Sequence, residues 1–290
     1  MAQILVVGSA VLDFVFSMEE LPEKAEKHRA NAMQIVGGGC AANASVAIAR
    51  LGGQAQLLAR FGRDEIYDLV AEDLAKEGVD LTLLDVAENG RSAVSSVYVD
   101  GSGERQIMAF RGEGLAEYPR ALGQLSQDAI LADTRWPHAS AMAFEGFDGI
   151  RVLDGEAPVP QSLAQTASHV VFSEQGLASF SGIASYPEAL LKVSEQIGGW
   201  VAVTLGAHGV AWVESGEIRN MAGFQVDVED TLGAGDVWHG AFTLRLAEGA
   251  SEADAMIFAN AAAALKCKGL GGRKATPDRS TVELFLKENT

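Results

Sequence analysis

The sequence predicts a doubly wound α/β fold, with a mainly parallel sheet, helices on both of its faces and a small β lid. Short apolar runs alternate with helical patterns along most of the 290 residues, and this alternation is typical of repeated βα units. Residues 92–110 depart from it, because two stretches of alternating polarity flank a turn-forming segment at residues 100–103. That pattern predicts an antiparallel hairpin, which contributes to the lid.

The elements of the sheet and its helices follow in order along the chain. We expect strands at residues 3–9, 55–62, 128–134, 150–156, 169–175 and 200–206. We expect helices at residues 43–52, 66–80, 234–248 and 252–267. Gly52 and Gly53 mark the end of the first helix, because glycine readily takes the left-handed conformation that stops a helix. We also expect a β-hairpin at residues 203–212, in the C-terminal third of the chain.

The lid is expected from two separate parts of the chain, at about residues 15–35 and 92–111. A flap over the edge of a doubly wound sheet is suited to cover a ligand cleft. The sequence has no repeats, low-complexity tracts or proline-rich linkers, so we expect residues 1–290 to form a single domain. Exposed strand edges on such a lid are protected when they pair, and we therefore expect a homodimer through the lid.

Composition and charge exclude several classes of protein. The net charge of −17 and the pI near 4.6 disfavour nucleic acid as a partner, because no basic surface is available to neutralise phosphates. Cys40 and Cys267 lie far apart, which argues against a disulfide framework and fits a reducing cytoplasm. The apolar N-terminus lacks a basic start and includes Gly8 and Asp13, so we expect a buried strand and no membrane partner.

A glycine-rich turn precedes the predicted helix at residues 234–248. Asp230 and Asp236 bracket this turn, which has almost no side chains between them. Glycines before a helix let successive N–H groups point at one place, and these groups together with the helix dipole bind an anion. A phosphoryl group in transfer is such an anion, and Asp236 beside it can accept a proton from an attacking alcohol. The alternative is an ordinary helix cap.

The run Asp230-Thr231-Leu232-Gly233-Ala234-Gly235-Asp236 strongly resembles the C-terminal motif of the PfkB (ribokinase-like) carbohydrate kinase family. Residues 36–52 resemble the N-terminal glycine motif of the same family, with Gly38, Gly39 and Asn43 at its positions. These glycines let a sugar approach the backbone, and the Asn43 amide can both donate to and accept from hydroxyls. Asp13 matches the aspartate of the family that binds sugar hydroxyls, although a strand-end cap is the alternative.

The resemblance covers essentially the whole chain and implies a ribokinase-like three-layer sandwich that uses ATP and Mg²⁺. Asp236 would be the catalytic base, and the amides of Gly233, Ala234 and Gly235 would form the anion hole. Asp230 and Thr231 would lie near a monovalent cation such as K⁺. The nucleotide would contact Thr204, Gly206, Gly209 and Asn260. The family usually has Asn-x-x-Glu after a central strand, whereas this chain has Ser173-Glu174-Gln175-Gly176, so Glu174 could replace the missing glutamate only with a different reach.

Basic residues suggest which sugar is phosphorylated. Arg135 follows an apolar strand and Lys27 belongs to the expected lid, and these positions resemble the branch of the family that phosphorylates 6-deoxy-6-sulfofructose at O1. An anionic tail would pair with both cations, whereas a neutral hydroxyl would leave Arg135 poorly paired. The branch has an asparagine on the returning lid strand where this chain has Ala109, and Arg111 could supply a different contact.

Several alternatives remain open from the sequence. Lys27 and Arg111 can be solvated lid charges, and Arg135 can pair with Asp133 or Asp154. The acceptor can instead be fructose phosphate, 2-keto-3-deoxygluconate, ribose or a nucleoside. A non-catalytic sensor of sugar or nucleotide can share the fold. His239 can face the substrate, but a place in the core or on the surface is expected. A dinucleotide-dependent dehydrogenase is excluded, because no G-x-G-x-x-G follows the first strand.

Overall fold

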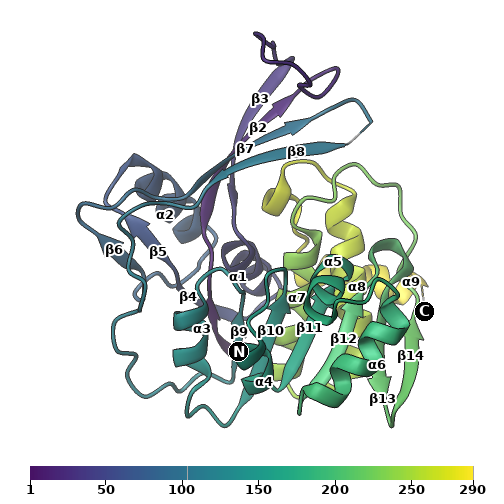
Figure 1. Ribbon diagram of the computed structural model, residues 1–290. Coiled ribbons are helices and arrows are strands. Elements are labelled where there is room, and N and C mark those ends of the chain that lie inside the picture. The colour runs from purple at the N-terminus through teal and green to yellow at the C-terminus, as the bar shows by residue number, and fades with distance from the viewer. Residues whose placement is uncertain (103, 290) are drawn as a thin grey trace.

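The centre of the protein is an eight-stranded sheet, described here from a computed structural model that covers residues 1–102 and 104–289 (Figure 1). From one edge to the other the strands are β14 (Glu217–Met221), β13 (Val210–Glu214), β12 (Trp200–Thr204), β11 (His169–Ser173), β10 (Ile150–Gly155), β9 (Ala129–Ala132), β1 (Gln3–Val7) and β4 (Gln54–Leu58). The six strands from β12 to β4 are parallel, and β13 and β14 are antiparallel. The predicted parallel sheet and the late hairpin are both confirmed.

Helices cover both faces of this sheet. One face packs against α1 (Cys40–Arg50), α2 (Glu65–Lys76), α7 (Ala234–Ala247), α8 (Glu252–Cys267) and α9 (Arg279–Asn289). The other packs against α3 (Pro137–Phe144), α4 (Gln161–Thr166), α5 (Glu174–Ser181) and α6 (Tyr186–Gln196). Two short 3-10 helices lie at Gly206–His208 and Gly272–Ala275. None of the described helices combines the length and apolar character that crossing a membrane requires.

Strand β1 shows how alternation builds the two cores. Ile4 and Val6 are fully buried in the core on one face, whereas Leu5 and Val7 are fully buried in the core on the other. Successive side chains of a strand point to opposite faces, so a continuous apolar run is what a strand covered on both sides requires. Each such side chain contributes about 1.5–3 kcal/mol when it is buried. The arrangement is the three-layer sandwich that the family resemblance implies.

The lid is a separate four-stranded sheet in the order β3 (Ala32–Gly38), β2 (Val11–Ser17), β7 (Val94–Val99) and β8 (Arg105–Phe110), and it projects from the body in Figure 1. Asp13, Ser95 and Ala109 stand in one row across its strands. The β2–β3 hairpin extends further toward the body than the expected residues 15–35. The hairpin of β7 and β8 is confirmed, although Gly103 of its expected turn lies outside the described residues.

The strand expected over residues 55–62 is wrong in one respect, because the chain leaves the main sheet at Ala59. Strand β4 ends at Leu58, and β5 (Arg60–Gly62) pairs instead with β6 (Asp85–Ala87) in a small two-stranded sheet. The helix expected over residues 66–80 ends at Lys76, just before Gly78 in a left-handed conformation (φ 79°). The strand prediction rested on one apolar run, and an apolar run does not show which strands will pair with its two halves.

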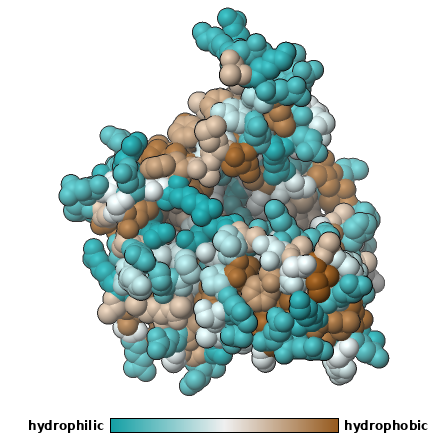
Figure 2. Space-filling view, viewed as in Figure 1, coloured by the Kyte–Doolittle hydropathy of each residue, from teal (hydrophilic) through white to brown (hydrophobic). Residues whose placement is uncertain are grey.

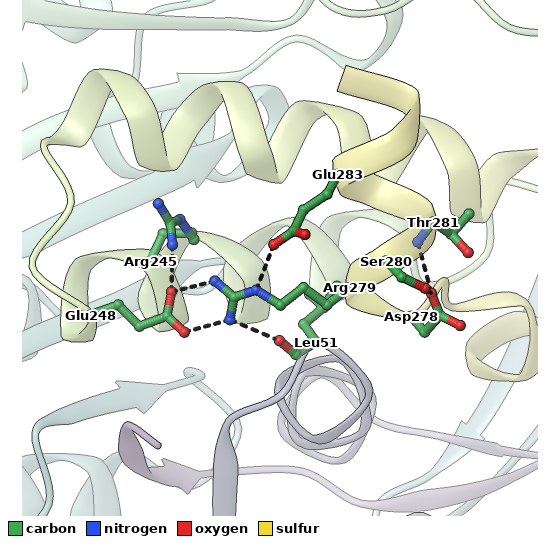
Figure 3. Close-up of polar contacts among 8 residues, drawn as sticks. All are labelled: Leu51, Arg245, Glu248, Asp278, Arg279, Ser280, Thr281 and Glu283. Atoms are coloured by element: carbon green, nitrogen blue, oxygen red, sulfur yellow. Dashed lines mark hydrogen bonds and ion pairs between the residues drawn. The ribbon is translucent and has the colours of Figure 1, made fainter. Parts of the chain in front are cut away.

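A cluster of charged side chains joins the C-terminal end of α7 to α9 and α1 (Figure 3). Arg279 donates to both carboxylate oxygens of Glu248, at 2.5 and 2.7 Å, and also to Glu283 and to the carbonyl oxygen of Leu51. Arg245 binds the same Glu248 carboxylate at 2.5 Å. The hydrogen bonds from Arg279, followed by those from Arg245, hold the pKa of Glu248 below its ordinary value. The cluster fixes three helices that lie on one face of the sheet.

Candidate active site

The first turn of α7 presents unpaired backbone donors. Gly233 precedes the helix in a left-handed conformation with φ 80°, which glycine adopts without strain. In the part of the chain that the structure describes, no acceptor receives the N–H groups of Gly233, Gly235 or Asp236, whereas Ala234 donates to the carbonyl oxygen of Thr231 at 3.2 Å. Free N–H groups at the positive end of a helix form an anion-binding site.

Asp236 lies in this first turn and is held by a residue of α1. The Asn43 side-chain nitrogen Nδ2 donates to Asp236 Oδ2 at 2.7 Å. Burial raises the pKa of Asp236 above its ordinary value, although the hydrogen bond from Asn43 opposes that shift. A raised pKa makes the ionised carboxylate a stronger base than an exposed aspartate. The geometry therefore suits Asp236 to accept a proton from a group bound next to it.

Acceptor groups for hydroxyls lie on the α1 side of Asp236. Asn43 Oδ1 is buried and has no partner among the described residues, and a buried unpaired acceptor is costly unless a ligand supplies the donor. Asp13 on β2 is 8% exposed, and burial raises its pKa against the opposing hydrogen bond from Ser95. A Cβ at Gly38 would overlap the Asp13 carboxylate, and Gly39 has a φ of 92°. The two glycines are therefore needed for this arrangement.

A buried polar cluster lies behind Asp236. His239 Nδ1 is 2.8 Å from the carbonyl oxygen of Gly235, and Nε2 is 3.2 Å from that of Val171. Because carbonyl oxygens only accept, both ring nitrogens carry protons when both bonds form. Asp154 Oδ1 lies 3.6 Å from Nε2. Burial alone would lower the pKa of His239, but Asp154 and the two carbonyls outweigh it and raise the pKa.

Two further groups complete this cluster. Burial raises the pKa of Asp154 to about 7, and it also raises the pKa of the Cys40 thiol well above its ordinary value. The protonated thiol donates toward Asp236. Donor atoms of Cys40, Asp154 and Asp236 lie within 4.8 Å of one another, but a thiol whose pKa is raised well above its ordinary value disfavours a metal ion there. The cluster instead surrounds Asp236 with proton-bearing groups.

A cavity of about 380 Å³ opens beside the N-terminus of α7 and is suited to a nucleotide. Four of the predicted nucleotide residues line it, namely Thr204, Gly206, Gly209 and Asn260. Gly235 and Thr231 also line it, so the anion-binding turn forms one end of the cavity. Asn260 accepts from Trp238 at 2.7 Å and donates to the carbonyl oxygen of Ala222. Its amide thus shapes the wall and is already hydrogen-bonded.

A second cavity of about 380 Å³ lies between the inner face of the lid and the same turn. Val15 and Val97 of the lid, together with Thr231 and Gly272, are among its lining residues. Figure 2 shows the hollow beneath the lid. Arg105 of β8 crosses to the turn and donates to Thr231 Oγ1 at 2.5 Å. The lid and the anion-binding turn are therefore in direct contact.

The three basic residues assigned to a sugar tail lie apart. Lys27 is exposed in the connection at residues 18–31, at the outer end of the lid, whose tip is hydrophilic in Figure 2. Arg111 is exposed just after β8. Arg135 follows β9 at the carboxyl edge of the sheet, where Nη1 donates to the carbonyl oxygen of Ala157 at 2.6 Å. Within residues 1–102 and 104–289, no hydrogen bond or ion pair joins any two of these three side chains.

Comparison with known proteins identifies the family to which the chain belongs. Residues 1–279 match the pattern of the pfkB family carbohydrate kinases. The chain belongs to this family. It is similar to a Bacillus subtilis (strain 168) ribokinase, with 28% identity over 297 residues that cover 99% of this chain and 100% of the relative.

Solved structures agree with this assignment. A structure from Agrobacterium tumefaciens superimposes with a TM-score of 0.92 at 32% identity and covers 99% of this chain and 98% of that one. Arabidopsis thaliana ribokinase complexed with ribose and ATP gives a TM-score of 0.86 at 26% identity, and the match covers 99% of both chains. The protein is therefore an ATP-dependent carbohydrate kinase with a ribokinase-like fold.

The structure of this pfkB kinase differs from the sequence predictions at Glu174, and it brings further residues to the site. Glu174 is exposed at the start of α5 and is not among the residues that line the nucleotide cavity. The sequence predicts Asp154 only as a possible partner of Arg135 and predicts no role for Lys266 or Arg105, whereas the structure places Asp154 beside His239 and the other two beside Asp230. One signal was available for Lys266, because it is the only charged residue in the apolar run at residues 255–267.

Proposed function

We propose that this kinase transfers the γ-phosphoryl group of ATP to a primary hydroxyl of a small sugar, with Asp236 as the general base. One observation carries the proposal: the Asp236 carboxylate is held 2.7 Å from Asn43, next to N–H groups of α7 that have no acceptor among the described residues. Asn43 links the two sides of the site, because its unpaired Oδ1 is available to a sugar hydroxyl.

Each group then has a defined task. As the sugar oxygen forms its bond to phosphorus, its O–H bond breaks and Asp236 takes the proton, while the bond from phosphorus to the ADP oxygen breaks. The N–H groups of Gly233 and Gly235 stabilise the charge on the transferring group. Mg²⁺ bound with ATP would neutralise phosphate charge, mostly through water.

Ribose is the first acceptor that we propose. Asp13 and Asn43 Oδ1 offer acceptors to hydroxyl donors, as a neutral polyol requires. The Bacillus subtilis relative is named ribokinase, and the Arabidopsis thaliana structure is a complex with ribose and ATP. The similarity to these proteins supports a pentose more directly than any other acceptor.

A ketose with an anionic tail, such as 6-deoxy-6-sulfofructose, is the second candidate, because Arg135 is incompletely paired. Its side chain is 31% exposed, and Nη2 lies 4.0 Å from Glu156. A sulfonate or phosphate could accept from the remaining N–H groups of the guanidinium. Lys27 and Arg111 could join such a tail only after the lid rearranges.

A coupled assay of ADP release over a panel of sugars tests these proposals. The panel contains ribose, fructose 6-phosphate, 6-deoxy-6-sulfofructose, 2-keto-3-deoxygluconate and a nucleoside. We expect the highest kcat/KM for ribose, and binding without ADP release on every sugar would favour the non-catalytic sensor. Arg135→Ala should lower kcat/KM at least about tenfold for anionic sugars and much less for ribose. An equal loss on both would remove Arg135 from tail binding.

We also propose that a second copy of the chain covers the outer face of the lid. Met33, Ile35, Met108 and Phe110 are 39–70% exposed, and the strand register places them on one face. Met33→Lys combined with Met108→Glu should convert a dimer to a monomer in light scattering after gel filtration, whereas exposed Leu191→Lys on α6 should not. A monomeric wild type would contradict the proposal.

We place the enzyme in the cytoplasm, where its free thiols remain reduced.

A further inference from the structure

Lys266 in the last turn of α8 is an entirely buried lysine directed at the turn before the anion-binding site. Its side chain is 0% exposed, and Nζ donates to the carbonyl oxygen of Asp230 at 2.7 Å. Nζ also lies 3.4 Å from Asp230 Oδ2. A buried ammonium is costly unless it is paired, and here the oxygens of Asp230 provide the pairing.

The oxygens of Asp230 are already occupied by donors of the protein. Oδ1 accepts from the N–H of Leu232 at 2.8 Å, and Oδ2 accepts from the N–H of Gly272 at 3.1 Å. Both carboxylate oxygens of Asp230 are therefore already paired within the chain.

Thr231, the other residue expected beside a monovalent cation, also contacts a protein cation. Arg105 donates to Thr231 Oγ1 at 2.5 Å, and the same Nη2 lies 3.7 Å from Asp230 Oδ1. An added metal ion would meet two positive side chains and find the Asp230 oxygens committed, and repulsion between like charges is strong at such distances. The residues present do not fit a dissociable cation.

We infer that the ammonium of Lys266 is the built-in cation of this turn, and that the kinase therefore requires no dissociable monovalent cation. The ammonium ties the end of α8 to Asp230, and the N–H groups of Glu229 and Asp230 both donate to the carbonyl oxygen of Cys267. These contacts fix the turn three residues before Gly233. Lys266 is thus a positioning residue, and this inference rests on the proposed role of the turn in phosphoryl transfer.

The first test compares the wild-type kinase in KCl, NaCl and tetramethylammonium chloride at equal ionic strength. We expect kcat to stay within about twofold across the three salts, because the required charge is covalently attached. We also expect equal thermal midpoints in the three salts, and this readout does not depend on any sugar being turned over. Activation by K⁺ of more than about fivefold, or a K⁺-specific rise in the midpoint, would overturn the inference.

Matched variants then remove the charge with and without its volume. Lys266→Ala leaves space for an ion or a small amine, and K⁺ or methylammonium should raise its kcat and its thermal midpoint relative to tetramethylammonium. Lys266→Met fills that space without charge and should not respond, while exposed Lys268→Met should behave as wild type. An equal kcat in all four proteins, or loss in Lys266→Ala without any response to cations, would contradict the role.

The outcomes separate this inference from the proposed function. A kinase that turns over no sugar of the panel but shows no K⁺-specific change in thermal midpoint would refute the acceptor proposal alone. Turnover of ribose with a strict K⁺ requirement would refute the built-in cation alone. If Lys266→Ala fails to fold, the salt comparison on the wild type still decides the question.

Discussion

A cluster of charged side chains lies at each end of helix α7, and the two clusters shift the pKa values of their carboxylates in opposite directions. At the N-terminal end, burial raises the pKa of Asp236 and raises that of Asp154 to about 7. At the C-terminal end, hydrogen bonds from Arg279 and then Arg245 hold the pKa of Glu248 below its ordinary value. A helix dipole alone would produce the reverse, since it stabilises an anion at the N-terminus and destabilises one at the C-terminus.

The number and kind of hydrogen-bond donors around each carboxylate explain this contrast. Glu248 is paired with two guanidinium groups, and that of Arg279 also holds α9 in place, so its charge serves stability. Asp236 receives one amide donor, from Asn43, and is surrounded by groups that hold protons. Perturbed carboxylates with few partners are typical of sites for chemistry. The two ends of one helix therefore separate reactivity from stability.

Removal of the proposed base should have the largest effect on this comparison. Asp236→Asn should lower kcat by about 10²–10⁴ with little change in sugar KM, because an amide cannot accept the proton. Steady-state kinetics by ADP release measures the change. Glu248→Gln is the matched control and should keep kcat within about twofold. Full turnover in Asp236→Asn would reject Asp236 as the base.

A change behind the base should alter how stability depends on pH. Asp154 binds its proton more tightly in the folded state, so its contribution to stability is present below about pH 4 and falls as the pH rises toward about 7. Relative to Asp154→Asn, the wild type should lose about 2–4 kcal/mol of unfolding free energy over this range, since one pKa unit is about 1.4 kcal/mol. Urea unfolding of both proteins from pH 4 to 8 measures the difference, and a constant difference would contradict it.

The smallest effect is expected at the other end of the helix. Arg279→Met keeps much of the side-chain volume but removes the donors to Glu248 and Glu283. Because the side chain is 30% exposed, we expect a loss of about 1–2 kcal/mol of unfolding free energy with kcat unchanged. A drop in kcat larger than about threefold would mean that the two ends of α7 are coupled.

Local sequence predicted the parts of the fold and site that depend on local chemistry. The glycine-rich turn before α7 follows from its glycines, and the parallel strands follow from their apolar runs. The pairing of Lys266 with Asp230 joins residues 36 positions apart, and the contact of His239 with Asp154 depends on how α7 packs on the sheet. Such contacts arise only from tertiary packing. The break at Ala59 was missed for the same reason.

The lid is assembled from residues 11–38 and 94–110, whereas the turn that we propose to hold the phosphoryl group lies near residue 233. Groups that select the acceptor and groups that perform the transfer are therefore encoded in different stretches of the chain. If these two lid segments are exchanged for those of another pfkB kinase, the sugar that is phosphorylated should change, while the phosphoryl-transfer reaction is preserved. Such a chimera must retain Arg105, whose bond to Thr231 is where the two modules meet.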